Sequence, residues 1–140
     1  MTGDRTAIGG VGVGVDVIAI QRIGRLLRSY PEQFREFAFS SAERAYCDDQ
    51  VRPAQHYAGR WAIKEAFLKA IDAGDAGLDL ASIEVRRTPS LHLELDADAL
   101  DRLQERAGAT GKHADDVDVA ISLSHDESAG VAIGMVVVLY

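Results

Sequence analysis

The stretch GGVGVGVD, Gly9 to Asp16, combines four glycines with three valines and ends on a carboxylate. A dinucleotide-binding loop requires G-x-G-x-x-G, and in the two possible frames valine occupies the third glycine position, at Val15 or Val17. A phosphate-binding P-loop requires Gly-Lys-Ser/Thr, which the chain lacks. The alternation of valine with small residues instead predicts a β-strand from Ile8 to Val17, whose glycines permit another segment to approach closely.

Outward from this strand, the spacing of apolar residues alternates between the helical and the strand period. The predicted helices are Ile18–Tyr30, ended by Pro31, a short helix from Ser40 or Ser41 with a capping box to Glu43, a long helix Pro53–Ala73 stopped by Gly74, and Asp98–Arg106. The later predicted strands are Ile83–Val85, Leu91–Leu95, and a hairpin of Val119–Leu123 with Val131–Leu139. This order predicts an α+β fold with a mainly antiparallel sheet packed against one long helix and shorter helices.

Composition excludes several classes of protein. A net charge of −7 on 140 residues disfavours a general nucleic-acid binder. No apolar run approaches the roughly 18–20 residues of a membrane span, and the first residues lack the pattern of a secretory signal. The single cysteine, Cys47, cannot form an internal disulfide and is expected to be buried, which fits a reducing compartment. We expect one cytoplasmic domain over residues 1–140, with residues 1–7 disordered.

Asp16 is the first candidate functional residue. It ends the apolar alternation of the first strand and precedes the helix predicted from Ile18. One interpretation is an acid that caps or begins this helix, which is a common arrangement. The other is a metal ligand placed at the end of a strand. The stretch alone does not decide between them.

The second candidate is the segment RWAIKEAFLKA, Arg60 to Ala70, in the long predicted helix. At about 100° per residue, Ile63 and Phe67 share a core-facing arc, whereas Glu65 and Lys69 lie together on the other side. One interpretation is a weak surface pair between residues four apart. The other is a site for a metal and a phosphate, because Mg²⁺ binds one or two carboxylates together with phosphate oxygens.

The surroundings of Glu65 are consistent with the second interpretation, although this segment alone leaves both open. Arg60, Lys64 and Lys69 place three cations in one helix of an acidic protein, and a carboxylate among several cations is what a site for a metal and a phosphate needs. Asp16 and Glu65 are then the two carboxylates available to Mg²⁺.

Two further features are ambiguous from the residues alone. His125, in SLSHDESAG, follows an alternating strand, and it is either a turn histidine bonded to its own loop or a phosphate or base contact. Arg22, Arg25 and Arg28 form a basic stripe at a spacing of three. The stripe is either a solvated helix face or a docking surface for an acidic partner.

Four blocks of the chain, taken together, resemble the holo-acyl-carrier-protein synthase family, the small trimeric phosphopantetheinyl transferases. The blocks are GVGVDVIAIQRI (Gly12 to Ile23), FSSAERAYC (Phe39 to Cys47), AGRWAIKEAFLKA (Ala58 to Ala70) and SLSHDESAGVA (Ser122 to Ala132). Their order and spacing fit the family, and they span nearly the whole chain. The third block is the most specific.

The resemblance implies an enzyme that moves the 4′-phosphopantetheine arm of coenzyme A to a serine of an apo acyl carrier protein, in fatty-acid or polyketide biosynthesis. Asp16 and Glu65 match the ligands of Mg²⁺, and Lys69 matches a lysine near the pyrophosphate. The coenzyme A contacts that we expect are Arg60, Lys64, Lys69 and His125. The carrier serine also needs a base, for which a metal-ordered water or Glu65 are the candidates.

The resemblance also implies partners. Family members are homotrimers with active sites at subunit interfaces, so Asp16 and His125 of one site are expected from different chains. Arg22 falls on the helix that meets the acidic carrier, and Arg25 and Arg28 extend the same stripe. The alternative function is a non-catalytic module that keeps this fold and binds carrier proteins. Intact Asp16, Glu65 and Lys69 favour the enzyme.

Overall fold

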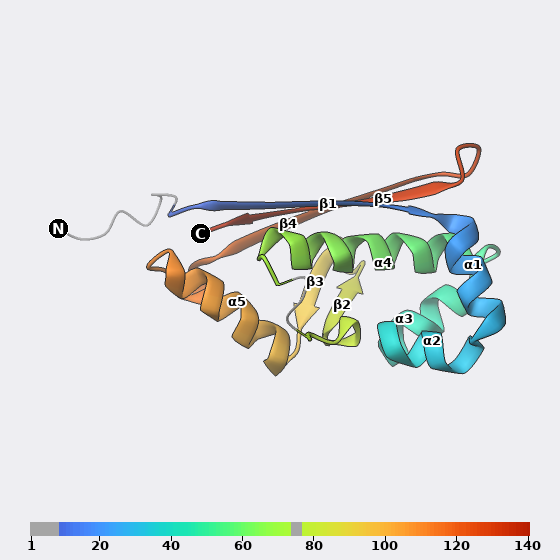
Figure 1. The fold of residues 1–140 in the computed structure, drawn as a ribbon, viewed down its shortest axis with the longest axis horizontal. Helices are drawn as coiled ribbons and strands as arrows, with labels where there is room; N and C mark the ends of the chain where they lie inside the picture. The colour runs from blue at the N-terminus through green and yellow to red at the C-terminus, as the bar shows by residue number, and fades with distance from the viewer. Residues whose placement is uncertain (1–8, 74–76) are drawn as a thin grey trace.

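The computed structural model describes residues 9–73 and 77–140 (Figure 1). Its elements are β1 (Val11–Ala19), α1 (Ile20–Ser29), α2 (Pro31–Ala38), α3 (Ser41–Asp48), α4 (Pro53–Ala70), the 3₁₀ turn η1 (Leu80–Ser82), β2 (Ile83–Arg86), β3 (His92–Leu95), α5 (Ala97–Ala109), the 3₁₀ turn η2 (Ala114–Asp116), β4 (Asp118–Asp126) and β5 (Val131–Leu139). The expectations for residues 1–7 and for a helix stop at Gly74 lie outside the described residues.

The strands form two antiparallel sheets. The larger has the order β1-β5-β4, so β5 lies between the first strand and its own hairpin partner. Its register places Asp16 of β1 opposite Gly134 of β5, and Gly134 opposite Leu123 of β4. The smaller sheet is the pair β2-β3, with Val85 opposite Leu93. The predicted α+β fold with a mainly antiparallel sheet is confirmed.

Helix α4 lies directly against the larger sheet because the residues between them are small. A Cβ atom on Gly14 of β1 would stand 2.7 Å from the carbonyl carbon of Ala66, and one on Gly134 of β5 would stand 2.5 Å from that of Ala62. Real Cβ atoms do not approach backbone so closely, so only glycine permits this contact. The glycines of the first strand therefore allow the backbone of α4 to pack directly on β1, which is the close approach that the sequence indicated.

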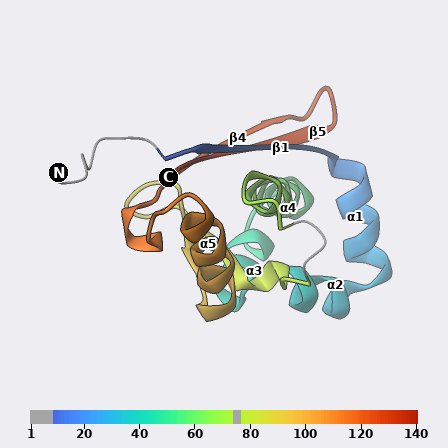
Figure 2. The same ribbon diagram turned by 60° about the vertical axis from the view of Figure 1, so that its left-hand side comes forward.

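The helix crosses the three strands diagonally. Gly59 packs against Leu123 of β4, Ala62 against β5, and Ala66 against β1. Figure 2 shows α4 beneath the sheet, with α3 and α5 on the side of α4 away from the sheet. One hydrophobic core surrounds α4, so this helix forms the central layer of the molecule.

This central position corrects the predicted face pattern of α4. The sequence indicated one core-facing arc and one polar side, but side chains on almost every side of the helix are buried. The buried set includes two cations, Arg60 at 2% and Lys64 at 0% exposure. A second layer of helices and the β2-β3 pair covers the side that periodicity assigned to solvent, and periodicity cannot report that layer.

Two helix boundaries differ from the prediction, and a third matches it. Pro31 begins a helix that the sequence analysis missed, because proline at the first helical position loses no intrahelical bond. Helix α4 ends at Ala70, with Ile71 as its C-cap, three residues before the predicted end. The predicted capping box is confirmed: Ser40 accepts a hydrogen bond from the backbone of Glu43, whose carboxylate accepts one from Ser40.

Among the described residues, none of the helices has the length and apolar character required to cross a membrane.

Candidate functional site

The first strand and the long helix bring a carboxylate and an ammonium together. The Nζ atom of Lys69 on α4 lies 3.2 Å from Oδ1 of Asp16 on β1, and it donates a hydrogen bond of 3.0 Å to the carbonyl of Val15. Lys69 reaches the strand because Gly14 lets the backbone of α4 approach at Ala66. The lysine side chain is half exposed, so its remaining donor capacity faces solvent.

Asp16 does not cap the following helix. The N-cap of α1 is Ala19, no side chain caps this helix, and its first turn has no acidic residue. The Asp16 side chain is 17% exposed. Its Oδ2 atom is buried, with no hydrogen-bond partner in the described part of the chain. A buried carboxylate oxygen without a partner is costly, so it indicates a site for a ligand that these residues do not themselves supply.

Glu65 interacts electrostatically with both Asp16 and Lys69. Burial raises the pKa of the Glu65 carboxyl above its ordinary value, and the charge of Asp16 adds to this rise, while Lys69 opposes it. The structure records no ion pair between Glu65 and Lys69 among the described residues; the lysine pairs with Asp16 instead. The surface Glu65–Lys69 pair considered from the sequence is therefore not the arrangement found.

These residues suit a hard divalent cation. Two carboxylates raise each other's pKa when they share a site without a cation, and a bound cation relieves this repulsion. The described residues contain no group of three or more histidine, cysteine, aspartate and glutamate side chains arranged as a metal site. Two protein carboxylates are sufficient for Mg²⁺ when phosphate oxygens and waters complete the shell. The donor set of Asp16 and Glu65 therefore fits Mg²⁺ with a phosphate ligand.

Arg60, five residues before Glu65 on α4, points into a separate pocket. Its guanidinium lies 4.4 Å from the centroid of the Tyr46 ring, and its Nε atom is buried without a hydrogen-bond partner among the described residues. Both side chains line a pocket of about 660 Å³ together with Arg86, Arg87 and Thr88. Two acids, Glu43 and Glu84, also line the pocket, but they are paired with Lys64 and Arg86. The remaining arginines and the stacked ring suit an anionic ligand with a planar group.

His125 lies at the N-terminal end of α4. It is a β4 residue whose ring is 6.2 Å from that of His56, centroid to centroid, and its Nε2 is 3.4 Å from Nε2 of Gln55. It contacts the helix rather than its own turn, which excludes the turn interpretation. Burial and the nearby Arg60, His125 and Arg87 lower the pKa of His56. This end of the helix is therefore electropositive, as a phosphate contact requires.

Asp16 and His125 are far apart within one chain. Their contacts on α4, Lys69 and Gln55, are fourteen residues apart, which is about 21 Å along a helix axis at 1.5 Å per residue. Strand β5 also lies between the two strands that carry them. One chain therefore does not gather the expected residues around one point.

Lys64 requires a correction. We expected Lys64 to contact coenzyme A, but its side chain is fully buried. Its Nζ donates to Oε1 of Glu43 at 2.6 Å and to the carbonyls of Ala38 at 2.6 Å and Leu80 at 3.1 Å. An ammonium has three donors, and protein acceptors use all of them. Lys64 therefore has no free donor for a ligand.

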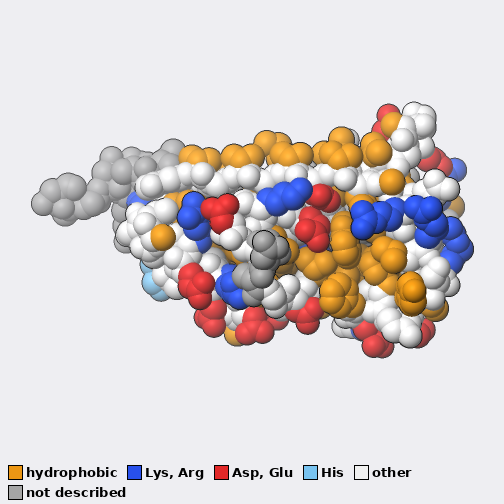
Figure 3. All heavy atoms as spheres, viewed as in Figure 1, with side chains coloured by type: hydrophobic (Ala, Val, Ile, Leu, Met, Phe, Trp, Pro, Cys, Tyr) orange, Lys and Arg blue, Asp and Glu red, His pale blue; other side chains and the backbone are white. Residues whose placement is uncertain are grey.

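The basic stripe of α1 is exposed. The side chains of Arg22, Arg25 and Arg28 are exposed, whereas Ile23 and Leu27 of the same helix are buried. Figure 3 shows lysine and arginine side chains gathered over this end of the molecule, beside an apolar area. The stripe is thus a continuous basic surface.

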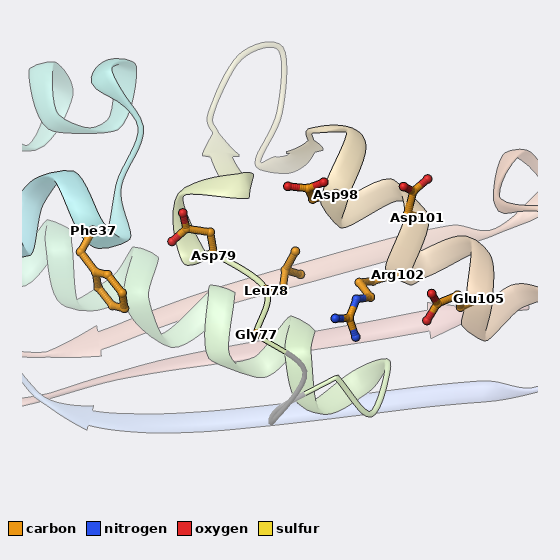
Figure 4. A pocket seen from close by; sticks show the side chains of 8 residues that line it. All are labelled: Phe37, Gly77, Leu78, Asp79, Asp98, Asp101, Arg102 and Glu105. Carbon is orange, nitrogen blue, oxygen red and sulfur yellow. The ribbon is translucent and has the colours of Figure 1, made fainter.

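A second pocket has the opposite sign. It has a volume of about 580 Å³, and its lining includes Asp79, Asp98, Asp101 and Glu105 along with Phe37 (Figure 4). Its carboxylates disfavour a phosphate-bearing ligand by charge repulsion. We therefore do not assign it to the candidate site.

Sequence reasoning missed several residues of the arginine-lined pocket. Arg60 and Arg87 both lie against the ring of Tyr46, and Gln55 and His56 approach His125. Tyr46 belongs to the segment FSSAERAYC, but only the packing of α3 on α4 shows that its ring contacts Arg60.

Comparison with known proteins defines the class. Residues 12–124 match the family model described as the 4′-phosphopantetheinyl transferase superfamily. This range includes Asp16 of β1 and all of α4, with Glu65 and Lys69, and it ends one residue before His125 of β4.

Relatives define the family more closely. A holo-[acyl-carrier-protein] synthase from Syntrophus aciditrophicus is 39% identical over 125 residues, 87% of this chain and 91% of that protein. One from Anaeromyxobacter sp. (strain K) is 39% identical over 133 residues, 91% and 94% of the two chains. The chain belongs to the holo-[acyl-carrier-protein] synthase family of 4′-phosphopantetheinyl transferases.

Solved structures agree with this assignment. An ACPS–CoA complex from Chronobacterium ammoniagenes has a TM-score of 0.75 and 32% identity, and the match covers 94% of this chain and 98% of that chain. The Helicobacter pylori holo-[acyl-carrier-protein] synthase in complex with coenzyme A has a TM-score of 0.69 and 28% identity, over 90% and 98% of the chains.

Proposed function

We propose that this protein transfers the 4′-phosphopantetheine arm of coenzyme A to a serine of an apo acyl carrier protein and releases 3′,5′-ADP. The serine oxygen forms a bond to the phosphorus that carries the arm, the pyrophosphate bond of coenzyme A breaks with 3′,5′-ADP as the leaving group, and the serine proton passes to a general base, for which Glu65 is the candidate among this chain's residues. The observation that carries the proposal is the cluster of Asp16, Glu65 and Lys69 in a chain of this family.

Asp16 and Glu65 are the residues that would hold Mg²⁺. The partnerless buried Oδ2 of Asp16 and the raised pKa of Glu65 support this role, because a cation removes both costs. When bound, Mg²⁺ neutralises charge on the phosphate oxygens and orients them for displacement.

Lys69 is the cation that these residues offer to the phosphate. Two of its contacts, Val15 O and Asp16 Oδ1, hold its ammonium at the edge of β1. In that position it donates to oxygens of the leaving phosphate, where negative charge increases in the transition state. Arg60 and His125 are proposed to bind coenzyme A through its other phosphate groups, in the electropositive pockets around Tyr46 and Arg87.

The separation of Asp16 from His125 supports an assembly. The outer face of β1 exposes Val11, Val13, Val15 and Val17 at 46–57%, and the adjacent β5 exposes Met135 at 41%. Figure 3 shows these apolar side chains as a row along the edge of the molecule. A continuous apolar row on a sheet face is typical of an interface. We propose the homotrimer that the family resemblance implies, with Asp16 and His125 of one site on different subunits.

The proposed carrier is acidic and docks on Arg22, Arg25 and Arg28. The stripe carries three exposed guanidiniums, although the net charge of the protein is −7. This local positive charge would steer an acidic surface to α1. A cytoplasmic location, in fatty-acid or polyketide biosynthesis, belongs to the same proposal.

Mass spectrometry tests the function directly. A panel of apo carriers is incubated with coenzyme A, Mg²⁺ and the protein, and at least one carrier should gain the mass of one phosphopantetheine arm as 3′,5′-ADP appears. Asp16→Asn should abolish the gain, whereas Asp118→Asn, an exposed β4 control, should not. Carrier binding without any mass gain across the panel would instead establish the non-catalytic module.

A further inference from the structure

Lys64 and Glu43 form an ion pair that is closed to solvent. Both side chains are 0% exposed, and Nζ lies 2.6 Å from Oε1. Burial lowers the pKa of Lys64, and the charge of Glu43 opposes this effect. Since a buried pair contributes little net stability compared with apolar residues of the same size, its presence calls for another explanation.

The pair joins five elements of the fold, α2, α3, α4, η1 and β2. Lys64 of α4 bonds the last residue of α2, Ala38, and the first residue of η1, Leu80. Glu43 of α3 accepts a hydrogen bond from Val85 of β2 through Oε2, at 3.0 Å. Such bonds are directional, so they set the relative positions of these segments more narrowly than apolar contact does.

The same contact between α3 and α4 carries part of the arginine-lined pocket. Tyr46 lies three residues after Glu43 on α3, and Arg60 lies four residues before Lys64 on α4. Residues at these spacings share a helix face. The Lys64–Glu43 ion pair and the Arg60–Tyr46 stack are therefore consecutive contacts between the same two helices. A shift of the first displaces the second.

The β2 side of the pocket depends on the same pair. Ser40, which Glu43 holds in the capping box, donates through Oγ to Oε1 of Glu84 at 2.8 Å. Glu84 in turn accepts from Arg86 at 2.9 Å. Glu84 and Arg86 both line the pocket with Arg60. Glu84 thus connects to the ion pair through two hydrogen bonds, and Arg86 connects through three.

We propose that Lys64 is a positioning residue, which with Glu43 sets the geometry of the Tyr46–Arg60 pocket and thereby the affinity for coenzyme A. It touches no ligand, and its three donors remain on protein acceptors. Glu65, the next residue on α4, interacts electrostatically with Asp16 and Lys69 instead. The inference rests on the proposed transferase function, because it assigns coenzyme A to this pocket.

The test separates positioning from stability. In Lys64→Met the Glu43 charge is left buried and unpaired, so the melting temperature should fall steeply. In the double variant Lys64→Met/Glu43→Gln both charges are removed with little change in shape, and stability should largely return. The double variant should nevertheless show a KM for coenzyme A raised about tenfold, as expected when charge-assisted bonds that orient a site are lost, with kcat within about twofold.

A matched control is Arg35→Met. Arg35 also bonds an acid of α3, Asp48 at 3.1 Å, but it does not line the pocket. Its KM for coenzyme A should be that of the wild type. A double variant with wild-type KM, or one that loses kcat at unchanged KM, would overturn the positioning role.

Calorimetric titration of coenzyme A keeps the two proposals distinct. If the wild type binds coenzyme A but modifies no carrier, the transferase function fails while the positioning role is still tested by the dissociation constants of the wild type and the double variant. Equal dissociation constants in that experiment would reject the positioning role by themselves.

Discussion

A Cβ atom on Gly14 would stand 2.7 Å from the carbonyl carbon of Ala66 and 2.9 Å from the amide nitrogen of Ala70. Both neighbours are helix backbone, which cannot move aside as a flexible side chain can. The distance between β1 and α4 is therefore set by the absence of a side chain at this position. The same contact brings Lys69 to Asp16, so the geometry of the candidate site depends on it.

Gly14→Ala should lower the free energy of unfolding by roughly 1–3 kcal/mol or more, because it overpacks a backbone contact. Urea denaturation followed by circular dichroism measures the change. Gly108→Ala is the control: it lies within α5, and nothing stands within 4 Å of its added Cβ. Alanine there should raise stability by up to about 1 kcal/mol. Equal stability of Gly14→Ala and the wild type would disprove the close-contact account.

Mg²⁺ binding should weaken in mild acid. Burial and Asp16 raise the pKa of Glu65, so this carboxyl retains its proton at pH values where an ordinary glutamate, with a pKa of about 4.3, is ionised. The cation must displace that proton. Calorimetric titrations should therefore show affinity falling as the pH drops through the raised pKa, above the range of an exposed glutamate.

Lys69→Met provides the matched variant for this effect. The Lys69 charge lowers the pKa of Glu65, so its removal should move the pH midpoint of Mg²⁺ binding upward. An affinity that stays constant down to the ordinary glutamate range would contradict the shared environment of Asp16 and Glu65.

Self-association should require the valine row of β1. Val13→Glu places a charge on the outer sheet face, where the valine is 53% exposed, and burial of that charge in an interface is costly. Light scattering after size-exclusion chromatography should show a smaller species than the wild type, with loss of transferase activity. Val51→Glu, at a valine 97% exposed and outside the sheet, should keep the wild-type mass. A wild type that is already monomeric would refute the proposed trimer.

Arg22→Glu should weaken binding of the carrier while Mg²⁺ and coenzyme A binding stay unchanged, since the stripe is separate from both pockets. The defect should be larger at low ionic strength than at high, because salt screens exposed charges. Surface plasmon resonance with an immobilised apo carrier measures it. Carrier affinity that does not respond to the charge reversal would remove the stripe from the docking surface.

Cys47 should be inert in the native protein. Its side chain is fully buried, and burial raises the pKa of the thiol to about 12. The thiolate is the reactive form, so very little of it exists near pH 8. A disulfide exchange reagent should label one equivalent of thiol only after unfolding in guanidinium chloride. Rapid labelling of the folded protein would show that the thiol is accessible.

Local sequence was sufficient for the elements whose signals are local. The valine alternation of β1, the capping box of Ser40 and Glu43, and the β4-β5 hairpin all follow from short-range rules, and the structure confirms them. The helix at Pro31 was missed because proline can either stop one helix or start the next, and local pattern does not distinguish these outcomes.

The sequence by itself determined the antiparallel fold class, the close approach permitted by the β1 glycines, and the candidate residues Asp16, Glu65 and Lys69. Only the tertiary structure decided which cation faces which acid. Lys69 reaches Asp16 across the contact at Gly14, whereas Lys64, five residues earlier on the same helix, is enclosed by Glu43 and two carbonyls. The physical reason is that α4 is buried on nearly every side. Periodicity reports which residues share a helix face, but only packing reports what covers each face.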